Sequence, residues 1–276
     1  MIDKSQNTLS PASTARRGNM PRLVIRVGNG TLDFLLPDAE GNLKHESYSV
    51  RSGVSMAANL RQAFRESQLL RAQDRFALIS VSSPVALIPV DEYMDDTDFD
   101  VSGVYDMTFL GYESEQKLTK VLPDLGTVCV FAVNKDLKMV VEDHFTDVRI
   151  QNVMQPVWSH LYRNSMLVGR RRKLYGYFHD RHVDIFSFQQ RRFRFANSFD
   201  ATHQHDALYY LLFAWTQLAM NNEEDELHIV GNIEYKEWLV AKLKQHLRNV
   251  YVINPVADLN RAPGTMIKGL DYDMMF

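Results

Sequence analysis

Residues 22–50 read RLVIRVGNGTLDFLLPDAEGNLKHESYSV, and this stretch decides the fold. Apolar and β-branched runs alternate with the turn signals Gly28–Gly30 and Asp38–Asn42, a pattern typical of strands joined by tight turns. Apolar residues from Ala57 to Leu70 then recur at helical spacing. The stretch therefore predicts a three-stranded antiparallel meander that is followed directly by a helix.

The same order of elements returns about 150 residues later, which predicts an internal duplication. Strand patterns at 174–178, 182–188 and 191–196 precede a helix with an apolar stripe that begins at Leu208. Each half is expected to read β-β-β-α-β-α-β, with a mixed sheet covered by helices. We place a first half at 21–170 and a second at 171–256. A disordered tail is expected at 1–20, and a C-terminal tail at 257–276 whose Met-Met-Phe ending docks on the body.

Composition excludes several classes of protein. The 276 residues carry a net charge of −3, with 45% hydrophobic and 24% charged residues, so nothing global favours nucleic acid or an acidic membrane surface. The single cysteine, Cys129, lies in an apolar run and is expected to be a buried thiol in a reducing compartment. The longest apolar stretch, Leu208–Met220, is shorter than the roughly 20 residues that span a membrane. These features predict a cytoplasmic protein without membrane insertion.

Two short motifs carry a resemblance to a known fold. Val24–Gly30 resembles the first phosphate loop of actin-like ATPases, and His228–Ile233 with the following helix and strand to Pro255 resembles their adenosine motif. Over about residues 22–255 the chain resembles an uncharacterised bacterial family of the Bacteroides group. It is also similar to cytoplasmic actin-like scaffolds of pilus and secretion machines. The resemblance implies two tandem ribonuclease-H-like halves in the actin-like ATPase architecture.

This chain departs from the pattern of that fold at the positions that handle nucleotide. Arg26 stands where actin-like ATPases have an acidic residue, the turn at 179–182 lacks a glycine, and Asn232 replaces one glycine of a pair. Because Mg²⁺ needs oxygen ligands and phosphates need bare backbone, the substitutions predict a degenerate site, hence a pseudo-ATPase without cofactor. If the cleft binds anything, the resemblance places these residues there: Gly28, Asn29, Gly30, His179, Asp180, His182, Gly231 and Asn232.

Four weaker patterns remain to be weighed. Basic residues Arg191, Arg192 and Arg194 alternate with Phe193 and Phe195, which are expected to share one face of a strand; this pattern could bind single-stranded nucleic acid. The net charge makes a solvated face the better interpretation. Histidines and aspartates gather at 179–184 and at 203–206, and carboxylates at 91–100; we interpret the first two as turn and cap chemistry and the third as a solvated loop, with no metal.

The sequence favours a non-catalytic actin-like protein that binds a protein partner or a second copy of itself as a scaffold. The alternatives are a protein that binds ATP with Mg²⁺ through atypical phosphate loops and, third, a nucleic-acid-binding module.

Overall fold

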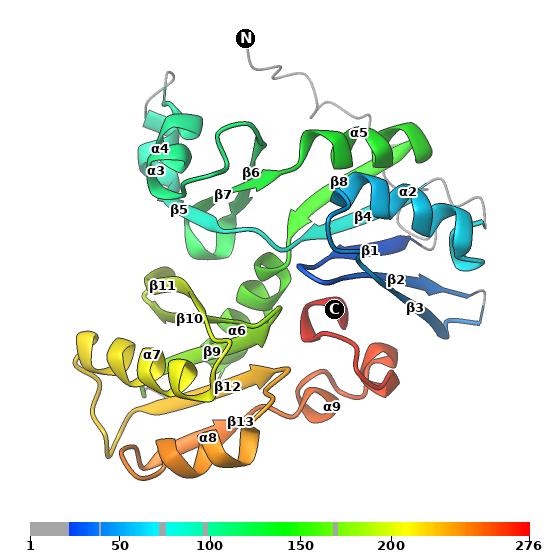
Figure 1. Cartoon of the computed structure of the whole chain (residues 1–276). Coiled ribbons are helices and arrows are strands. Elements are labelled where there is room, and N and C mark those ends of the chain that lie inside the picture. The colour runs from blue at the N-terminus through cyan, green and yellow to red at the C-terminus, as the bar shows by residue number, and fades with distance from the viewer. Residues whose placement is uncertain (1–21, 39, 72–75, 96–98, 168–170) are drawn as a thin grey trace.

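The computed structural model describes residues 22–38, 40–71, 76–95, 99–167 and 171–276. The expected tail at 1–20 lies outside the described residues. Two lobes, one above the other in Figure 1, are each built around a five-stranded mixed sheet. The strands of the first sheet are β1 (Leu23–Val27), β2 (Thr31–Pro37), β3 (Leu43–Ser49), β4 (Phe76–Val81) and β8 (Asp147–Asn152). Those of the second are β9 (Lys173–His179), β10 (His182–Gln189), β11 (Arg192–Asp200), β12 (Glu226–Gly231) and β13 (Asn249–Val252).

The two sheets have the same topology. Their orders are β3-β2-β1-β4-β8 and β11-β10-β9-β12-β13, so equivalent strands occupy equivalent places. In each, the first three strands along the chain pair antiparallel as a meander, and the last two add in parallel. The fold class predicted from the meander and its return is confirmed. The central strands β1 and β9 are almost continuously buried because neighbours flank them and other elements cover both sheet faces.

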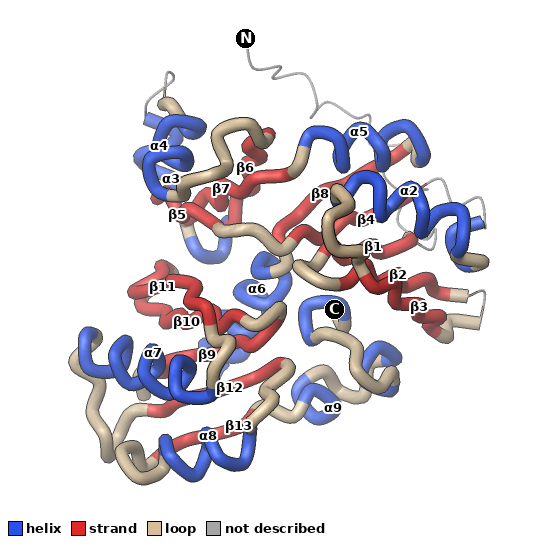
Figure 2. Tube along the Cα trace, viewed as in Figure 1, coloured by secondary structure: helices blue, strands red, loops and turns tan. Residues whose placement is uncertain are grey.

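Helices cover the outer face of each sheet (Figure 2). The core of the first lobe lies between its sheet and helices α2 (Met56–Glu66) and α5 (Lys135–His144). The second lobe packs α7 (Gln204–Gln217) and α8 (Lys236–Leu243) in the same way. The inner face of the second sheet packs instead on α6 (Met154–Leu167), which leaves the first lobe and lies between the two.

An inserted subdomain between β4 and α5 is the main departure from the predicted plan. It holds a separate antiparallel sheet, ordered β5-β7-β6, with helices α3 and α4. Residues 127–133 therefore belong to this third sheet, and helix α4 and strand β6 were not predicted. Cys129 lies in β7 and is fully buried, as expected. The bounds are β5 (Val85–Pro89), α3 (Val90–Asp95), α4 (Val101–Thr108), β6 (Gln116–Leu122) and β7 (Thr127–Val133).

The C-terminal segment, red in Figure 1, lies between the lobes. After α9 (Pro255–Asp258) it forms two short 3₁₀ turns, Pro263–Met266 and Tyr272–Met274. Leu270 and Met274 are buried against Leu35 of β2, on the face of the first sheet opposite α2 and α5. The inner face of the second sheet is thus covered by α6, which follows the first lobe, and the inner face of the first sheet by the C-terminal segment, which follows the second lobe. The Met-Met-Phe ending packs on the body, as the sequence indicated.

Candidate functional site

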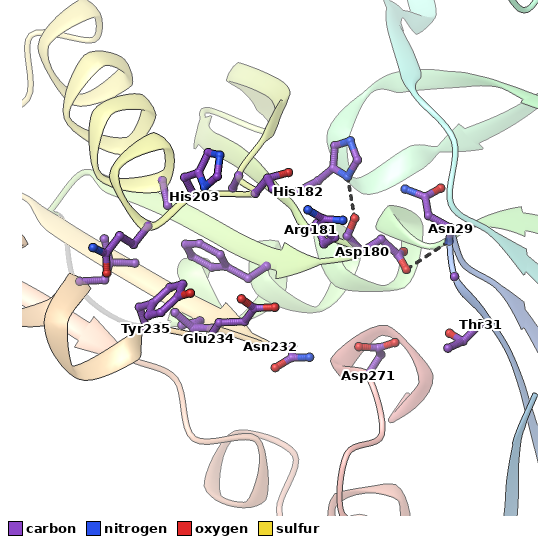
Figure 3. Close-up of a pocket in the computed structure, with 18 residues that line it drawn as sticks. Asn29, Thr31, Asp180, Arg181, His182, His203, Asn232, Glu234, Tyr235 and Asp271 are labelled. Carbon is purple, nitrogen blue, oxygen red and sulfur yellow. Dashed lines mark hydrogen bonds between the residues drawn. The ribbon is translucent and has the colours of Figure 1, made fainter. Parts of the chain in front are cut away.

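A cavity of about 280 Å³ lies between the two lobes. The hairpin turns β1–β2 and β9–β10 form one side, and the start of α7 with the loop before α8 forms the other (Figure 3). Asp271 of the C-terminal segment closes one end. Apolar lining comes mainly from the second lobe, through Phe178, Ala207, Ile233, Tyr235 and Leu239.

The central feature beside this cavity is the side chain of Arg26, which is completely buried near the end of β1. Its Nη2 donates to Asp180 Oδ2 at 2.8 Å and its Nε to Asp273 Oδ2 at 3.0 Å. Its Nη1 lies 3.2 Å from both Asp180 Oδ1 and Asp271 Oδ2. One guanidinium therefore joins the first lobe, the β9–β10 turn of the second lobe and the C-terminal segment.

The buried carboxylates around Arg26 are further supported by neutral and cationic donors. Tyr177 donates a short hydrogen bond to Asp273. His179 contacts Asp180 through Nδ1 at 3.0 Å and Asp184 through Nε2 at 2.6 Å. Burial alone would lower the pKa of His179, but the two carboxylate contacts outweigh it and raise the pKa to about 10. Both ring nitrogens therefore donate, and His179 is an imidazolium at neutral pH.

The pKa values of two carboxylates beside Arg26 are shifted in opposite directions. Burial opposes ionisation of Asp180, but its contacts to His179 and Arg26 hold its pKa well below the usual range. The pKa of Asp271 is raised to about 6, because burial and its neighbours Asp273 and Asp180 outweigh the attraction of Arg26. We call Arg26, Asp180, Asp271, Asp273 and His179 the interlobe ion cluster.

The turn that presents Asp180 is a two-residue hairpin. Asp180 and Arg181 have φ angles of 46° and 65°, the left-handed pair that matches the twist of the flanking strands. The side chains of Arg181 and His182 line the cavity, and His182 Nδ1 lies 2.9 Å from the carbonyl oxygen of Asp180. The turn thus presents side chains to the cavity, because it lacks the glycine that would leave bare backbone there.

The three glycines expected at the site differ in how much space surrounds them. Gly231 has a φ of 101°, and a Cβ there would stand 2.2 Å from the carbonyl oxygen of Phe178. A Cβ at Gly28 would stand 2.6 Å from Asp180 Oδ1 and 2.7 Å from Arg26 Nη1. Gly30 has open space around it. Gly28 and Gly231 are therefore needed for internal packing, and neither lines the cavity.

Most of the remaining predicted cleft residues do meet at one place. Asn29, Gly30, Asp180, His182 and Asn232 line the cavity (Figure 3). His179 lies behind it in the ion cluster. Asp271 and Asp273 were missed, because the sequence around them has no periodic or turn signal that would direct it to a cleft.

The residues present do not fit a magnesium nucleotide. The actin-like arrangement implied by the sequence resemblance uses carboxylates to hold Mg²⁺ through water. Here a guanidinium lies between the carboxylates, at 2.8–3.2 Å from three of them, and a second positive charge at His179 contacts Asp180. Both carboxylate oxygens of Asp180 and Asp273, and one of Asp271, are already engaged by these cations.

Two of the three arginines considered for nucleic-acid binding donate hydrogen bonds to other groups of the chain. Arg192 Nη2 donates to Asp91 Oδ2 at 3.1 Å, and Arg194 Nη2 donates to the carbonyl oxygen of Leu218 at 2.5 Å. The expectation that Phe193 and Phe195 share a face is wrong. Phe193 packs on the α6 side of the sheet and Phe195 on the α7 side. The reason is a register shift between β10 and β11, which places an extra residue in β11.

The predicted acidic loop is partly helical. Residues 90–95 form α3, and Asp100 caps α4 by accepting a hydrogen bond from Gly103 N at 3.0 Å. Residues 96–98 of that expectation lie outside the described residues. Among the residues that the structure describes, no group of three or more histidine, cysteine or acidic side chains is arranged to hold a metal ion.

The histidine and aspartate group at 203–206 lies at the start of α7. There Asp206 caps the helix by accepting a hydrogen bond from His203 N at 3.1 Å.

Comparison with known proteins gives a family without an assigned activity. Residues 13–250 match the family described as "Protein of unknown function (DUF3822)". No curated protein matches. In the described part of the chain, the helices are too short or too polar to cross a membrane.

Two solved structures show the same fold. A Bacteroides thetaiotaomicron protein with an actin-like ATPase fold and unknown function superposes with a TM-score of 0.78 at 24% identity, covering 90% of this chain and 97% of its own. The PilM–PilN type IV pilus biogenesis complex matches with a TM-score of 0.55 at 14% identity, over 87% of this chain and 90% of the matched chain. These likenesses confirm the actin-like fold, and the family match over residues 13–250 confirms the predicted resemblance to an uncharacterised family.

Proposed function

We propose that this chain, which belongs to the DUF3822 family and has the actin-like ATPase fold, is a non-catalytic, cytoplasmic scaffold that binds another protein. Its lobes are held together by its own side chains instead of by a nucleotide. The observation that carries this proposal is the placement of Arg26 between Asp180, Asp271 and Asp273.

The physical reason is that the ion cluster supplies internally what a metal nucleotide would supply from outside. The guanidinium of Arg26 in the first lobe attracts carboxylates of the second-lobe turn and of the C-terminal segment, and thereby connects the lobes. A buried guanidinium in this position repels a divalent cation and engages the oxygens that would ligate it. The PilM–PilN complex supports a protein partner by analogy of fold, since that relative assembles with another protein.

The first test is a thermal-shift scan of the intact chain with ATP and Mg²⁺, with EDTA, and without additions. The proposal expects the same unfolding midpoint in all three. A ligand at about 100 times its Kd would stabilise the fold by about 2.7 kcal/mol, which is easily detected. Magnesium-dependent turnover of ATP that disappears in Asp180→Ala would refute the non-catalytic assignment.

The second test concerns the partner. Affinity purification from the native lysate is expected to retain a specific protein, or a second copy of the chain, equally well with ATP or EDTA. A monodisperse monomer that retains no partner under any of these conditions would contradict the scaffold proposal.

A second candidate is supported by the cavity itself. Its volume of about 280 Å³ is close to the lower limit for small-molecule sites, and its apolar lining beside Asn29 and Asn232 suits a nucleoside or a similar planar ligand. Binding of ATP or adenosine that is independent of Mg²⁺ and lost in Asn232→Trp would support this candidate. We prefer Asn232 to Gly231 for this test, because Asn232 is exposed whereas a side chain at Gly231 meets the backbone.

A further inference from the structure

We propose that a groove between β5 and β11 binds an extended peptide segment of a partner protein, added as a strand between two open sheet edges. This inference rests on the proposed scaffold function and gives its site and the chemistry of its partner. The groove is a cavity of about 580 Å³, within the range of ligand sites in proteins. It lies on the opposite side of the β9–β10 turn from the cavity described above, and His182 lines both.

Both long walls of the groove are terminal strands. β5 ends the order of the inserted sheet, and β11 ends the order of the second-lobe sheet. Figure 1 shows the two strands facing each other between the inserted subdomain and the lower lobe. A terminal strand pairs on one side only, so its outward N–H and C=O groups have no strand partner.

The lining residues indicate that strand edges, not faces, border the groove. Successive side chains of a strand point to opposite faces, so a cavity over one face contacts every second residue. This groove is lined by the consecutive residues 84–88 along β5 and by 196, 197, 198 and 200 along β11. Contact with both alternating sets places the cavity alongside each backbone, where an added strand would form hydrogen bonds.

A buried donor without an acceptor gives a second, independent indication of a ligand. Trp158 of α6 lines the groove and is only 3% exposed. Its indole N–H has no hydrogen-bond acceptor among the described residues. Buried indole N–H groups normally find a partner, because leaving one unpaired is unfavourable. Because the Nε1 atom itself is shielded from solvent, the carbonyl oxygen of a bound peptide would supply the missing acceptor only after a small shift of the lining side chains.

The charges in the groove define the peptide further. Its lining contains no lysine or arginine. Asp184 contacts His179, whereas Asp200 is an exposed carboxylate at one end of the groove. The pKa of Asp200 is lowered by hydrogen bonds from Thr202 and, less strongly, by the neighbouring His182 and Arg181. Val85, Leu87 and Met154 contribute apolar side chains to the lining. The structure therefore favours an apolar extended segment with a basic residue, or a free amino terminus, near Asp200.

The experiment uses a phage-displayed library of random linear peptides, selected on the intact chain. Selected peptides are synthesised and their affinities measured by isothermal titration. Asn197→Trp fills the groove from an exposed position on β11, and Ser47→Trp on exposed β3 is the matched control outside the groove. We expect at least tenfold weaker binding for Asn197→Trp and unchanged binding for Ser47→Trp.

Two further variants test the chemistry. Trp158→Phe keeps the ring packing but removes the indole N–H, and should weaken binding roughly five- to tenfold, the value of one hydrogen bond. Asp200→Asn keeps the acceptor for Thr202 and should weaken only peptides that carry a basic residue. Amide hydrogen exchange should show new protection in β5 and β11 when the peptide is bound.

The outcomes separate this inference from the scaffold proposal. A library that yields no binder, or peptides unaffected by Asn197→Trp, would overturn the groove. If the natural partner were still captured by Asn197→Trp, the scaffold function would stand and its site would lie elsewhere. If no partner were captured by the unmodified chain, the scaffold proposal itself would fail.

Discussion

Removal of the Arg26 guanidinium is the sharpest test of the ion cluster. Arg26→Met keeps much of the side-chain volume but leaves Asp180, Asp271 and Asp273 facing one another without their shared cation. Breaking a buried ion pair by removing one partner costs about 3–5 kcal/mol, because the remaining charge is buried and uncompensated. For a chain near this length each kcal/mol corresponds to about 2–4 °C, so the unfolding midpoint should fall by roughly 6–20 °C.

The assay is thermal and urea unfolding followed by circular dichroism. The matched control is Arg51→Met, which breaks an exposed ion pair with Glu66 whose side chains are 60% and 47% exposed. Exposed pairs contribute about 0–1 kcal/mol, so the control should barely change the midpoint.

A double variant identifies the cause of the loss. Arg26→Met with Asp273→Asn should recover part of the stability, because one uncompensated carboxylate is then neutral. Added Mg²⁺ should also stabilise Arg26→Ala more than the unmodified chain, since it can approach the carboxylates that Arg26 left. A loss in Arg26→Met no larger than in Arg51→Met would refute the view that this cluster holds the lobes together.

The remaining predictions concern single groups of the cleft. Because the pKa of folded His179 is raised to about 10 from 6.5, its stabilisation is complete below about pH 6.5 and is lost as pH rises toward 10; His179→Gln should flatten this decline in urea unfolding, and an unchanged alkaline slope would contradict the assignment. Because the pKa of Asp271 is raised to about 6 from 3.8, stability should rise as pH falls from about 7 to 4 through this group; Asp271→Asn should remove that rise without lowering the midpoint at pH 7, and a lower midpoint would argue against it. Gly231→Ala should lower the free energy of unfolding by about 1–3 kcal/mol, because its φ of 101° and the contact with Phe178 O exclude a side chain. Gly30→Ala, in open space at the same cleft, is the control. Equal unfolding midpoints for the two variants would refute the steric argument.

Local pattern was sufficient for most of the secondary structure and for the duplication. The strands of both meanders and the helices after them follow from apolar alternation and turn residues, which are properties of neighbouring residues in sequence. The same reasoning failed where a long-range context decides. The extra residue in β11 reversed the face of Phe195 relative to Phe193, since it depends on the pairing with β10 and not on β11 alone. The inserted sheet was missed for a similar reason: β6 has an irregular burial pattern and becomes a strand by pairing with β7.

At the cleft, the sequence by itself showed an arginine, Arg26, where the resemblance to actin-like ATPases leads one to expect an acidic residue, and turns without the expected glycines. It could not determine what this arginine does. Its partners Asp180 and Asp273 lie 154 and 247 residues away, and neither local periodicity nor spacing connects them. Only the tertiary structure brings the second-lobe turn and the C-terminal segment to the same guanidinium. The physical reason is that burial removes competing water, so a charge on a buried strand must be matched by carboxylates that the tertiary fold brings next to it.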